Sequence, residues 1–389
     1  MAHLQMWFAA CVLATPTWTL RTLGSYSEFC TKYGRQHVDQ QDYTMRQELY
    51  RQRVAAVQEI NGHQTLPWKA SVNAFADFTR EEFSQLLGHR RGPAQSQSFL
   101  QLSASSEGAF EGKLRSLTEG ILRIVGLHTP AGLPSSVDWR SLNTSEFHKV
   151  QGACGSCWAV AAVGALEMHA EIQAKRTPEE LSVKQLLDCV PNPRHCGGRG
   201  GCEGASAELA FQFVSQHGLT SAETTAAQNL CASPPAPYLR VQGFGRLRSN
   251  HLRSILEALT TRGPLVVGVD ASHWDLYGQG VFDACERDAT INHAVLLLGY
   301  GQEALGLPFW RVRNSWGKDW GEAGYMRLLR HDADSGAEGF CGVDRSPQEG
   351  VWCEGEQQQV PVCGMCGILS DATYPEQVTL AASSRDSLP

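Results

Sequence analysis

The sequence has no apolar run long enough to cross a lipid bilayer, no block of basic residues and no internal repeat. Its apolar run near the N-terminus, residues 6–14, is far shorter than the roughly 20 residues that a transmembrane helix needs. Lys and Arg number 33 against 40 Asp and Glu, which gives a formal net charge of −7. Such a balance does not favour nucleic acid as a partner. We therefore expect a chain with no membrane span, no nucleic-acid partner and no solenoid architecture.

Cysteine, by contrast, is abundant. Thirteen cysteines are many for a cytosolic protein, because a reducing compartment would leave most of them as free thiols, so we expect the secretory route. Residues 1–14 resemble a signal peptide with small residues at Val12 and Ala14, although no Lys or Arg precedes the apolar run. A buried N-terminal segment is the alternative. On the secretory route, Asn143 in Asn-Thr-Ser would be a glycosylation site.

A reactive cysteine is indicated by the stretch that begins at Gln151, Gln-Gly-Ala-Cys-Gly-Ser-Cys-Trp-Ala. Cys157 follows a Gly/Ser turn and starts an apolar run that predicts a helix. At a helix N-terminus, the dipole and the free N–H groups favour the thiolate. The thiol needs a proton-transferring partner, and His293 (Ile-Asn-His-Ala-Val) and Asn314 (Asn-Ser-Trp-Gly) are the candidates. His293 lies 136 residues after Cys157, and Asn314 follows 21 residues later.

These motifs and their spacing resemble the papain-like cysteine proteases. The resemblance implies that Cys157 attacks a peptide carbonyl, that His293 transfers protons and that Asn314 orients the imidazole ring. It also implies that Gln151 helps to stabilise the oxyanion and that Trp316 shields the His–Asn hydrogen bond from water. The expected activity is that of a cysteine endopeptidase with an acyl-enzyme mechanism and no metal or cofactor.

The segment before these motifs resembles the inhibitory propeptide of the cathepsin L-like branch. Residues 25–88 have the polar, periodic pattern of amphipathic helices. Seven residues correspond to the first propeptide motif, four of them with an altered residue type: Asp42, Arg46, Leu49, Tyr50, Arg53, Val57 and Asn61. Residues 73–79 resemble the second motif. The Ser-, Gln- and Gly-rich residues 89–130 predict an exposed linker for processing. We expect a zymogen that is activated by removal of about residues 15–130.

Residues 131–377 are predicted to form the mature α+β peptidase domain, followed by a polar tail at 378–389. Residues 157–240 carry helical patterns, such as the one at 205–217 that ends before Gly218. Short apolar runs farther on predict strands at 264–269, 294–300, 309–313 and 324–329. The resemblance implies a papain-like fold, with a helical half and a β-barrel half on either side of an active-site cleft.

The resemblance also implies three disulfides, which join Cys154 to Cys202, Cys189 to Cys231, and Cys285 to a cysteine near the C-terminus. Cys366 matches that last position better than Cys341, because Tyr374-Pro375 follows at the family's spacing. Residues 341–365 then form a cysteine-containing insertion. Four cysteines keep no assigned partner: Cys196, Cys341, Cys353 and Cys363.

The same alignment predicts the S2 pocket, which receives the substrate side chain two residues before the scissile bond. It places Asp371 at the pocket floor and Gly268 and Ala294 in the walls, so that the pocket would be roomy and would accept Arg or Lys as well as apolar groups. A solvated loop position for Asp371 is the alternative. Gly204 and Ala205 would pair with the substrate backbone, and the methyl group of Ala205 departs from the family's glycine.

Other interpretations remain open. Cys154 and Cys157 form a C-x-x-C, which is also found in redox enzymes and in structural disulfides, but its surroundings do not resemble a βαβ unit. Zinc in the cysteine-rich loop 189–202 is a further alternative. Ala205, the insertion, and Asn292 in place of the family's acidic residue keep open a second function class, a catalytically weakened protein that binds peptides or inhibitors.

The expected partners are protein and peptide substrates, the chain's own propeptide and cystatin-like inhibitors, and the expected state is a monomer. The segment between Cys231 and Pro264 has no insertion large enough to block the cleft as in exopeptidase relatives. A lysosome-like or vacuolar compartment is favoured, with secretion as the alternative.

Overall fold

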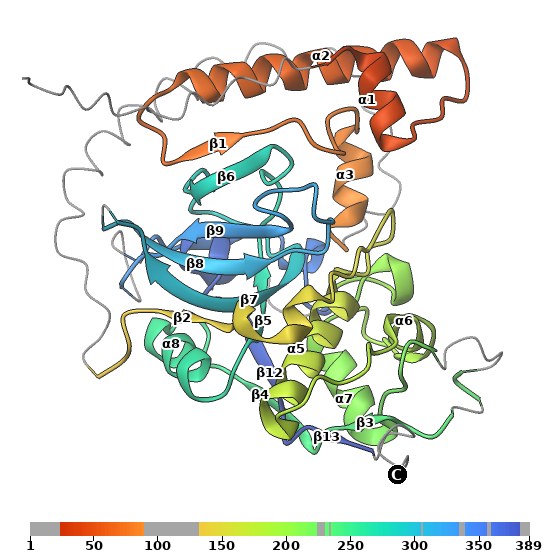
Figure 1. Cartoon of the computed structure of the whole chain (residues 1–389), viewed down its shortest axis with the longest axis vertical. Helices are drawn as coiled ribbons and strands as arrows, with labels where there is room; N and C mark the ends of the chain where they lie inside the picture. The colour runs from red at the N-terminus through yellow and green to blue at the C-terminus, as the bar shows by residue number, and fades with distance from the viewer. Residues whose placement is uncertain are drawn as a thin grey trace, which may run out of the picture.

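The computed structural model describes seven stretches of the chain: residues 24–88, 132–223, 230–232, 235–304, 306–333, 339–355 and 359–381. The predicted signal peptide at 1–14 and the predicted linker at 89–130 lie outside the described residues, as does most of the predicted tail, residues 382–389. Figure 1 shows a long helix across one end of the molecule, a sheet below it and a group of helices beside the sheet.

Residues 24–88, called the pro-region below, contain three helices and one strand. These are α1 (Tyr26–Tyr33), α2 (Gln40–Gly62), β1 (Trp68–Ala70) and α3 (Arg80–Leu86). Ser25 and Thr79 begin α1 and α3 with capping boxes, in which the hydroxyl accepts a backbone N–H and a glutamate reaches back. Because β1 pairs antiparallel with β6 (Tyr277–Phe282), the pro-region extends the edge of the main sheet (Figure 1).

The helical half is built around α5 (Cys157–Ala174), with α6 (Val183–Cys189) and α7 (Ala207–His217) packed against it. Fourteen of the 18 residues of α5 are buried, as expected of a helix that is apolar on almost every side. The predicted helix at 205–217 begins two residues later than expected, because Ser206 caps it by accepting the N–H of Leu209. It ends at His217, before Gly218, as predicted.

The other half is a nine-stranded sheet whose main path runs β1-β6-β9-β8-β7-β5-β12-β4, with β2 paired to β7. All four predicted strands are present in it. Their bounds are β5 (Leu265–Val269), β7 (His293–Gln302), β8 (Pro308–Arg313) and β9 (Tyr325–Leu329), and the remaining strands are β2 (Val137–Asp138), β4 (Gly243–Arg246) and β12 (Ala372–Glu376). One helix, α8 (Leu252–Thr261), contributes its buried leucines to the same core.

The strands of the β half form one sheet whose outer strands are β1 and β4. Within the described residues, the strand order starts at β1 and ends at β4, and no pairing joins these two edges. The edge strand β1 belongs to the pro-region. The predicted strands all lie in the mature part, so this strand is not among them. The α+β, papain-like architecture itself is confirmed.

Shorter elements complete the chain. Two small sheets pair β3 (Leu239–Arg240) with β13 (Thr379–Leu380), and β10 (Gly342–Asp344) with β11 (Val360–Val362). The 3-10 turns are η1 (Trp139–Ser141), η2 (Asn143–Glu146), η3 (Gly201–Glu203), η5 (Pro347–Glu349) and η6 (Met365–Gly367). None of the helices in the described part of the chain is both long and apolar enough to cross a membrane.

Candidate active site

Cys157 is the first residue of α5, as its sequence context predicts. Its side chain is 3% exposed, and the backbone N–H groups of Ala294, Trp158 and Cys157 itself are directed at the sulfur. The hydrogen bond from Ala294 brings the sulfur next to the residue that follows His293. The sulfur therefore lies where the start of α5, from the helical half, meets the start of β7, from the β half.

His293 and Asn314 come from the facing ends of two neighbouring strands. His293 begins β7, Asn314 follows the last residue of β8, and these strands are antiparallel. The imidazole Nε2 donates to the Asn314 Oδ1 at 2.8 Å, while Nδ1 has no hydrogen-bond partner among the described residues. The Trp316 ring covers the imidazole at 5.0 Å between centroids, inclined by 30°. The ring is thus oriented through one nitrogen and keeps the other for a reactant.

The Gln151 amide points into the same space. Its Nε2 donates to the backbone carbonyl of Cys154 at 2.8 Å and to that of Leu86, in the pro-region, at 2.7 Å. The Ser315 hydroxyl donates to its Oε1 and fixes the orientation of the amide. A side-chain N–H beside the cysteine therefore already holds a peptide carbonyl oxygen, which is what an oxyanion site requires.

The end of the pro-region lies directly on these residues. A Cβ built on Gly88, whose φ is +66°, would lie 3.1 Å from the Cys157 Sγ and 3.9 Å from the Gly204 Cα. Phe75 and Phe83 pack edge-on against Trp316, with centroid distances of 5.1 and 5.3 Å. The glycine permits this close approach because a side chain there would meet the sulfur. The pro-region covers the cleft in this structure.

Burial in this structure reverses the expected charge state of the cysteine–histidine pair. Burial raises the pKa of Cys157 to about 11, in spite of the N–H groups around the sulfur. Burial also lowers the pKa of His293 to about 4, and the hydrogen bond to Asn314 only partly offsets this effect. The helix N-terminus alone led us to expect a thiolate. With water excluded, the uncharged thiol and imidazole are favoured instead.

The three residues predicted to line the S2 pocket lie together. Gly268 faces Ala294 across the β5–β7 pair, and its N–H donates to the Asp371 carbonyl at 2.9 Å. A Cβ on Gly268 would lie 3.5 Å from the Asp371 Oδ2, so the carboxyl group is directed toward this wall. Gly204 and Ala205 come from the helical half, where Gly204 lies beneath Gly88.

Two charged residues that sequence reasoning missed surround Asp371. The Arg246 Nη2 lies 3.3 Å from the Asp371 Oδ1, and the Arg246 Nε lies 3.6 Å from the Glu208 Oε1. Burial raises the pKa of Asp371 to about 7, and the Glu208 charge adds to the rise while Arg246 opposes it. Since β4, α7 and the C-terminal segment are far apart in sequence, no local motif marks this group.

Comparison with known proteins assigns the chain to a family. A model described as papain family cysteine protease matches residues 133–351, which is more than half of the chain, and a cathepsin propeptide inhibitor domain (I29) matches residues 26–83. The chain belongs to the papain family of cysteine proteases. It is a cysteine endopeptidase that carries its own propeptide inhibitor domain.

Relatives in this family align with more than four fifths of the chain. Cathepsin L 1 of Paramecium tetraurelia is 31% identical over 339 residues, which are 84% of this chain and 91% of the relative. Fruit bromelain of Ananas comosus is 29% identical over 337 residues, 83% of this chain and 84% of the relative. The solved structure of a recombinant stem bromelain precursor superposes with a TM-score of 0.65 at 28% identity and covers 90% of this chain and 97% of that one.

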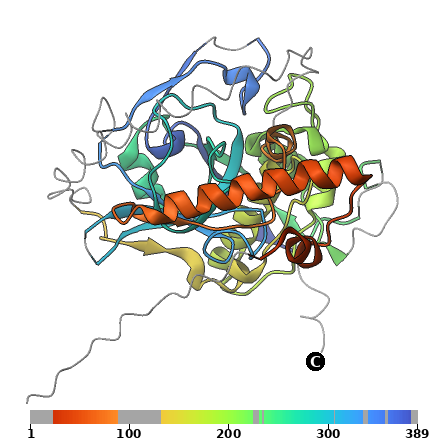
Figure 2. The same cartoon turned by 90° about the horizontal axis from the view of Figure 1, so that it is seen from above.

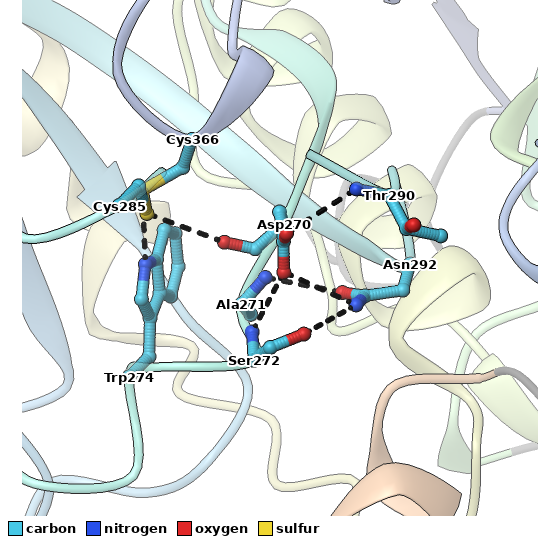
Figure 3. Close-up of a disulfide and its surroundings, with 8 residues drawn as sticks. All are labelled: Asp270, Ala271, Ser272, Trp274, Cys285, Thr290, Asn292 and Cys366. Atoms are coloured by element: carbon cyan, nitrogen blue, oxygen red, sulfur yellow. Dashed lines mark hydrogen bonds between the residues drawn. A yellow bond between two sulfur atoms is a disulfide. The ribbon is translucent and has the colours of Figure 1, made fainter. Parts of the chain in front are cut away.

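Asn292, which precedes His293, forms hydrogen bonds with the turn after β5 (Figure 3). Its Oδ1 accepts the Ala271 N–H at 3.1 Å, and its Nδ2 donates to the Ser272 Oγ at 2.9 Å and to the Asp270 Oδ1 at 3.3 Å. Figure 3 also shows the Cys285–Cys366 disulfide next to Asp270. The amide supplies both an acceptor and donors, which the family's acidic residue would not do when ionised.

The disulfides include the three pairs that the resemblance implies: Cys154–Cys202, Cys189–Cys231 and Cys285–Cys366. The cysteines without an assigned partner form two more, Cys196–Cys353 and Cys341–Cys363. Outside these bridges, the described cysteines are Cys30 and Cys157, so Cys154 and Cys157 do not form a disulfide in this structure.

Asn143 and the metal alternative complete the sequence-predicted sites. Asn143 is exposed in η2, where its side chain donates to Glu171 and Thr177, each at 3.0 Å. Within the part of the chain that the structure describes, no group of three His, Cys, Asp or Glu side chains is arranged to hold a metal ion. In the proposed zinc loop, Cys189, Cys196 and Cys202 are each in a disulfide.

Proposed function

We propose that this papain-family zymogen hydrolyses peptide bonds through a thioester on Cys157, with His293 and Asn314 as its catalytic partners. The observation that carries the proposal is the convergence of a helix-terminal sulfur, an imidazole held through Nε2 and an amide N–H that already binds a peptide carbonyl. The alternative of a weakened binding protein has Ala205 in its favour, but it gives no reason for this convergence.

The chemistry follows from these positions. The Cys157 thiolate attacks the substrate carbonyl carbon, and the carbonyl electron pair moves to the oxygen, which Gln151 Nε2 and the Cys157 N–H stabilise. The intermediate collapses, the C–N bond breaks and the His293 Nδ1 gives its proton to the leaving amine. Water then loses a proton to His293 and attacks the thioester, which releases the carboxylic acid product and the thiol. Asn314 keeps the ring in place in both halves of the reaction.

Activation would expose the pair to water. We propose that removal of about residues 15–130 leaves a mature domain at 131–377, in which renewed hydration and the N–H groups around the sulfur favour the thiolate–imidazolium pair. Proteases of this family with such a propeptide generally belong to the secretory pathway or to vacuoles and lysosomes. A lysosome-like compartment, glycosylation at Asn143, a monomeric state and inhibition by cystatin-like proteins are parts of the same proposal.

The S2 pocket is proposed to change its preference with pH. Below a pH of about 7, Asp371 is protonated and the remaining charges of Arg246 and Glu208 balance, so apolar substrate side chains fit a neutral floor. Above this pH, the Asp371 and Glu208 carboxylates face the single Arg246 guanidinium. The positive charge of a substrate Arg or Lys side chain then offsets the extra negative charge. The side chain of Asp371 is 13% exposed, so its charge is only weakly screened.

The test is an assay of the acid-activated enzyme on paired fluorogenic dipeptides with Arg or Leu at the second position. We expect cleavage that disappears in Cys157→Ser and after a thiol-reactive epoxide, and an Arg-over-Leu ratio of kcat/KM that rises at least severalfold between pH 5 and pH 8. Asp371→Asn should abolish the rise. A flat ratio in the wild type would contradict the pocket assignment. Absence of turnover after complete propeptide removal would favour the binding protein.

A further inference from the structure

The insertion crosses from one half of the enzyme to the other. Five of its residues, 350–354, are called the strap below. On the β half, the Val351 N–H donates to the Ile291 carbonyl at 2.8 Å, and a Cβ on Gly350 would collide with the same carbonyl. The Ile291 N–H in turn donates to Asp344 in β10 at 3.2 Å. The start of the strap therefore contacts Ile291, which lies two residues before His293 in the sequence.

The far end of the strap is fixed to the helical half. The Gly197 N–H donates to the Trp352 carbonyl at 3.1 Å, and the Glu354 N–H donates to the Arg194 carbonyl at 3.1 Å. The adjacent disulfide, Cys196–Cys353, joins residues 157 positions apart. The Glu354 carboxylate also lies 2.9 Å from the His195 Nδ1. A covalent bond and these polar contacts attach residues 352–354 of the strap to residues 194–197 of the helical half.

The anchors of the strap adjoin residues of the predicted substrate site: Ile291 adjoins Gly268 in the S2 wall, and Gly197 adjoins Ala205, which is predicted to pair with the substrate backbone. A Cβ on Gly268 would meet the Ile291 side chain at 2.6 Å, and a Cβ on Gly197 would meet the Ala205 carbonyl at 2.6 Å. The Trp352 ring lies 5.7 Å from the Arg246 guanidinium, the group that contacts Asp371. The strap thus connects the β wall of the pocket to the part of the helical half that adjoins Ala205.

The strap is also held at its base. Cys341–Cys363 closes the ends of the insertion, and β10 pairs with β11 between them. In Figure 2 the blue segment around these strands lies along the edge of the molecule opposite the yellow strand β2. With two disulfides and a sheet pairing around it, the crossing has little freedom to swing away from the cleft.

We propose that the strap is a specificity-determining element that closes the acyl end of the cleft and limits substrates to about three residues before the scissile bond. An extended chain advances about 3.3 Å per residue. A peptide that fills the S2 pocket therefore reaches the strap with its next residue or two, and a longer chain must bend away there. This inference rests on the proposed function, because it takes Cys157 as the point from which substrate residues are counted.

The test uses the mature enzyme and blocked fluorogenic peptides that share their last two acyl residues but carry two, three or five residues in total before the scissile bond. We expect kcat/KM of the wild type to fall about tenfold from three to five residues. Cys196→Ser/Cys353→Ser should remove the fall, whereas the matched control Cys189→Ser/Cys231→Ser, which lacks a disulfide within the helical half, should keep it.

Two further measurements make the result decisive. Trp352→Ala leaves the Cys196–Cys353 disulfide intact and should also reduce the fall in kcat/KM with peptide length. This variant replaces the double cysteine variant if the latter does not fold. Affinities of the same peptides for the mature Cys157→Ser form, measured by fluorescence anisotropy, give the length dependence without turnover. Loss of activity therefore counts against the proposed function alone. Equal or rising affinity with length in this form, or a fall that persists in both strap variants, would overturn the strap proposal.

Discussion

The amide of Asn292 shows how one residue determines the backbone in front of His293. It connects the Ala271 N–H, the Ser272 hydroxyl and the Asp270 carboxylate, which belong to the turn after β5. The Thr290 N–H donates to the other oxygen of Asp270 at 3.2 Å. The loop that leads into His293 is thereby held by the neutral Asn292 amide together with the Asp270 carboxylate.

Restoring the family's acidic residue should therefore weaken the protein. Asn292→Asp removes the donors and puts a second carboxylate at the 3.3 Å contact with Asp270. We expect a loss of about 1–3 kcal/mol in the free energy of unfolding at pH 7, and a smaller loss at acid pH where a carboxyl can be protonated. Thermal unfolding of the mature Cys157→Ser form at pH 4.5 and 7 measures it. The double variant Asp270→Asn/Asn292→Asp should recover part of the loss, and an unchanged melting temperature at pH 7 would refute the argument.

At the scale of elements, an ion pair attaches α3 to α2 and stabilises the fold of the pro-region. Arg46 in α2 contacts Glu82 at 2.6 Å and Asp42 at 2.8 Å. Burial alone would raise the pKa of Glu82, but hydrogen bonds from Arg46 and the Thr79 N–H bring it below its ordinary value of 4.5. Because the folded-state pKa is the lower one, this contact stabilises the pro-region above pH 4.5, and the stabilisation is lost as the pH falls below that value.

Glu82→Gln should make activation possible at higher pH. The neutral side chain removes the charge at every pH, at a cost of roughly 1 kcal/mol for a partly exposed pair. We expect the pH of half-maximal activation to rise, as followed by the rate of appearance of activity. Glu48→Gln is the matched control, since among the described residues the Glu48 carboxylate contacts Arg51 and Gln52, both on the exposed face of α2 itself. An equal shift in both variants would show that α3 attachment is not the cause.

Short-range patterns account for most of what the sequence could predict. Cys157, His293 and Asn314 each lie in a motif that also begins or ends a helix or strand, so chemistry and local structure coincide. Arg246 and Glu208 have no such signal, because only the packing of β4 against α7 and β12 brings them to Asp371. The Cys196–Cys353 pairing is likewise a property of the folded chain. The uncharged state of Cys157 and His293 depends on burial, which short sequence motifs do not indicate.

At the scale of the whole molecule, the end of the pro-region lies on the proposed catalytic pair, Cys157 and His293. Burial raises the pKa of the Cys157 thiol to about 11, and Gly88 of the pro-region is among the residues next to the sulfur. The same burial lowers the pKa of His293 to about 4. We therefore expect inhibition by the pro-region to be electrostatic as well as steric, because burial disfavours the charges that the proposed reaction needs.

Alkylation of Cys157 by iodoacetamide separates these two effects. In the mature enzyme we expect reaction at pH 5–6, with a thiolate pKa well below the ordinary value near 9. In the zymogen, carrying Cys30→Ser so that the other described free thiol is absent, we expect roughly 100-fold slower reaction at pH 6 and a rise only above pH 9. Steric cover alone would lower the rate without moving its inflection, so an inflection between pH 5 and 8 in the zymogen would contradict the electrostatic part.

The pairing of β1 with β6 has a consequence for the enzyme after activation. The Val281 N–H donates to the Pro67 carbonyl and the Ser71 N–H donates to the Leu276 carbonyl, each at 2.9 Å, so the precursor completes the sheet with its own chain. Once that chain is removed, β6 becomes an outer strand with unsatisfied backbone groups, the kind of surface on which other strands add. Gly278 and Gly280 interrupt it and give an added strand few side chains to pack against. We therefore expect the glycines that let the precursor dock closely also to disfavour self-association of the product.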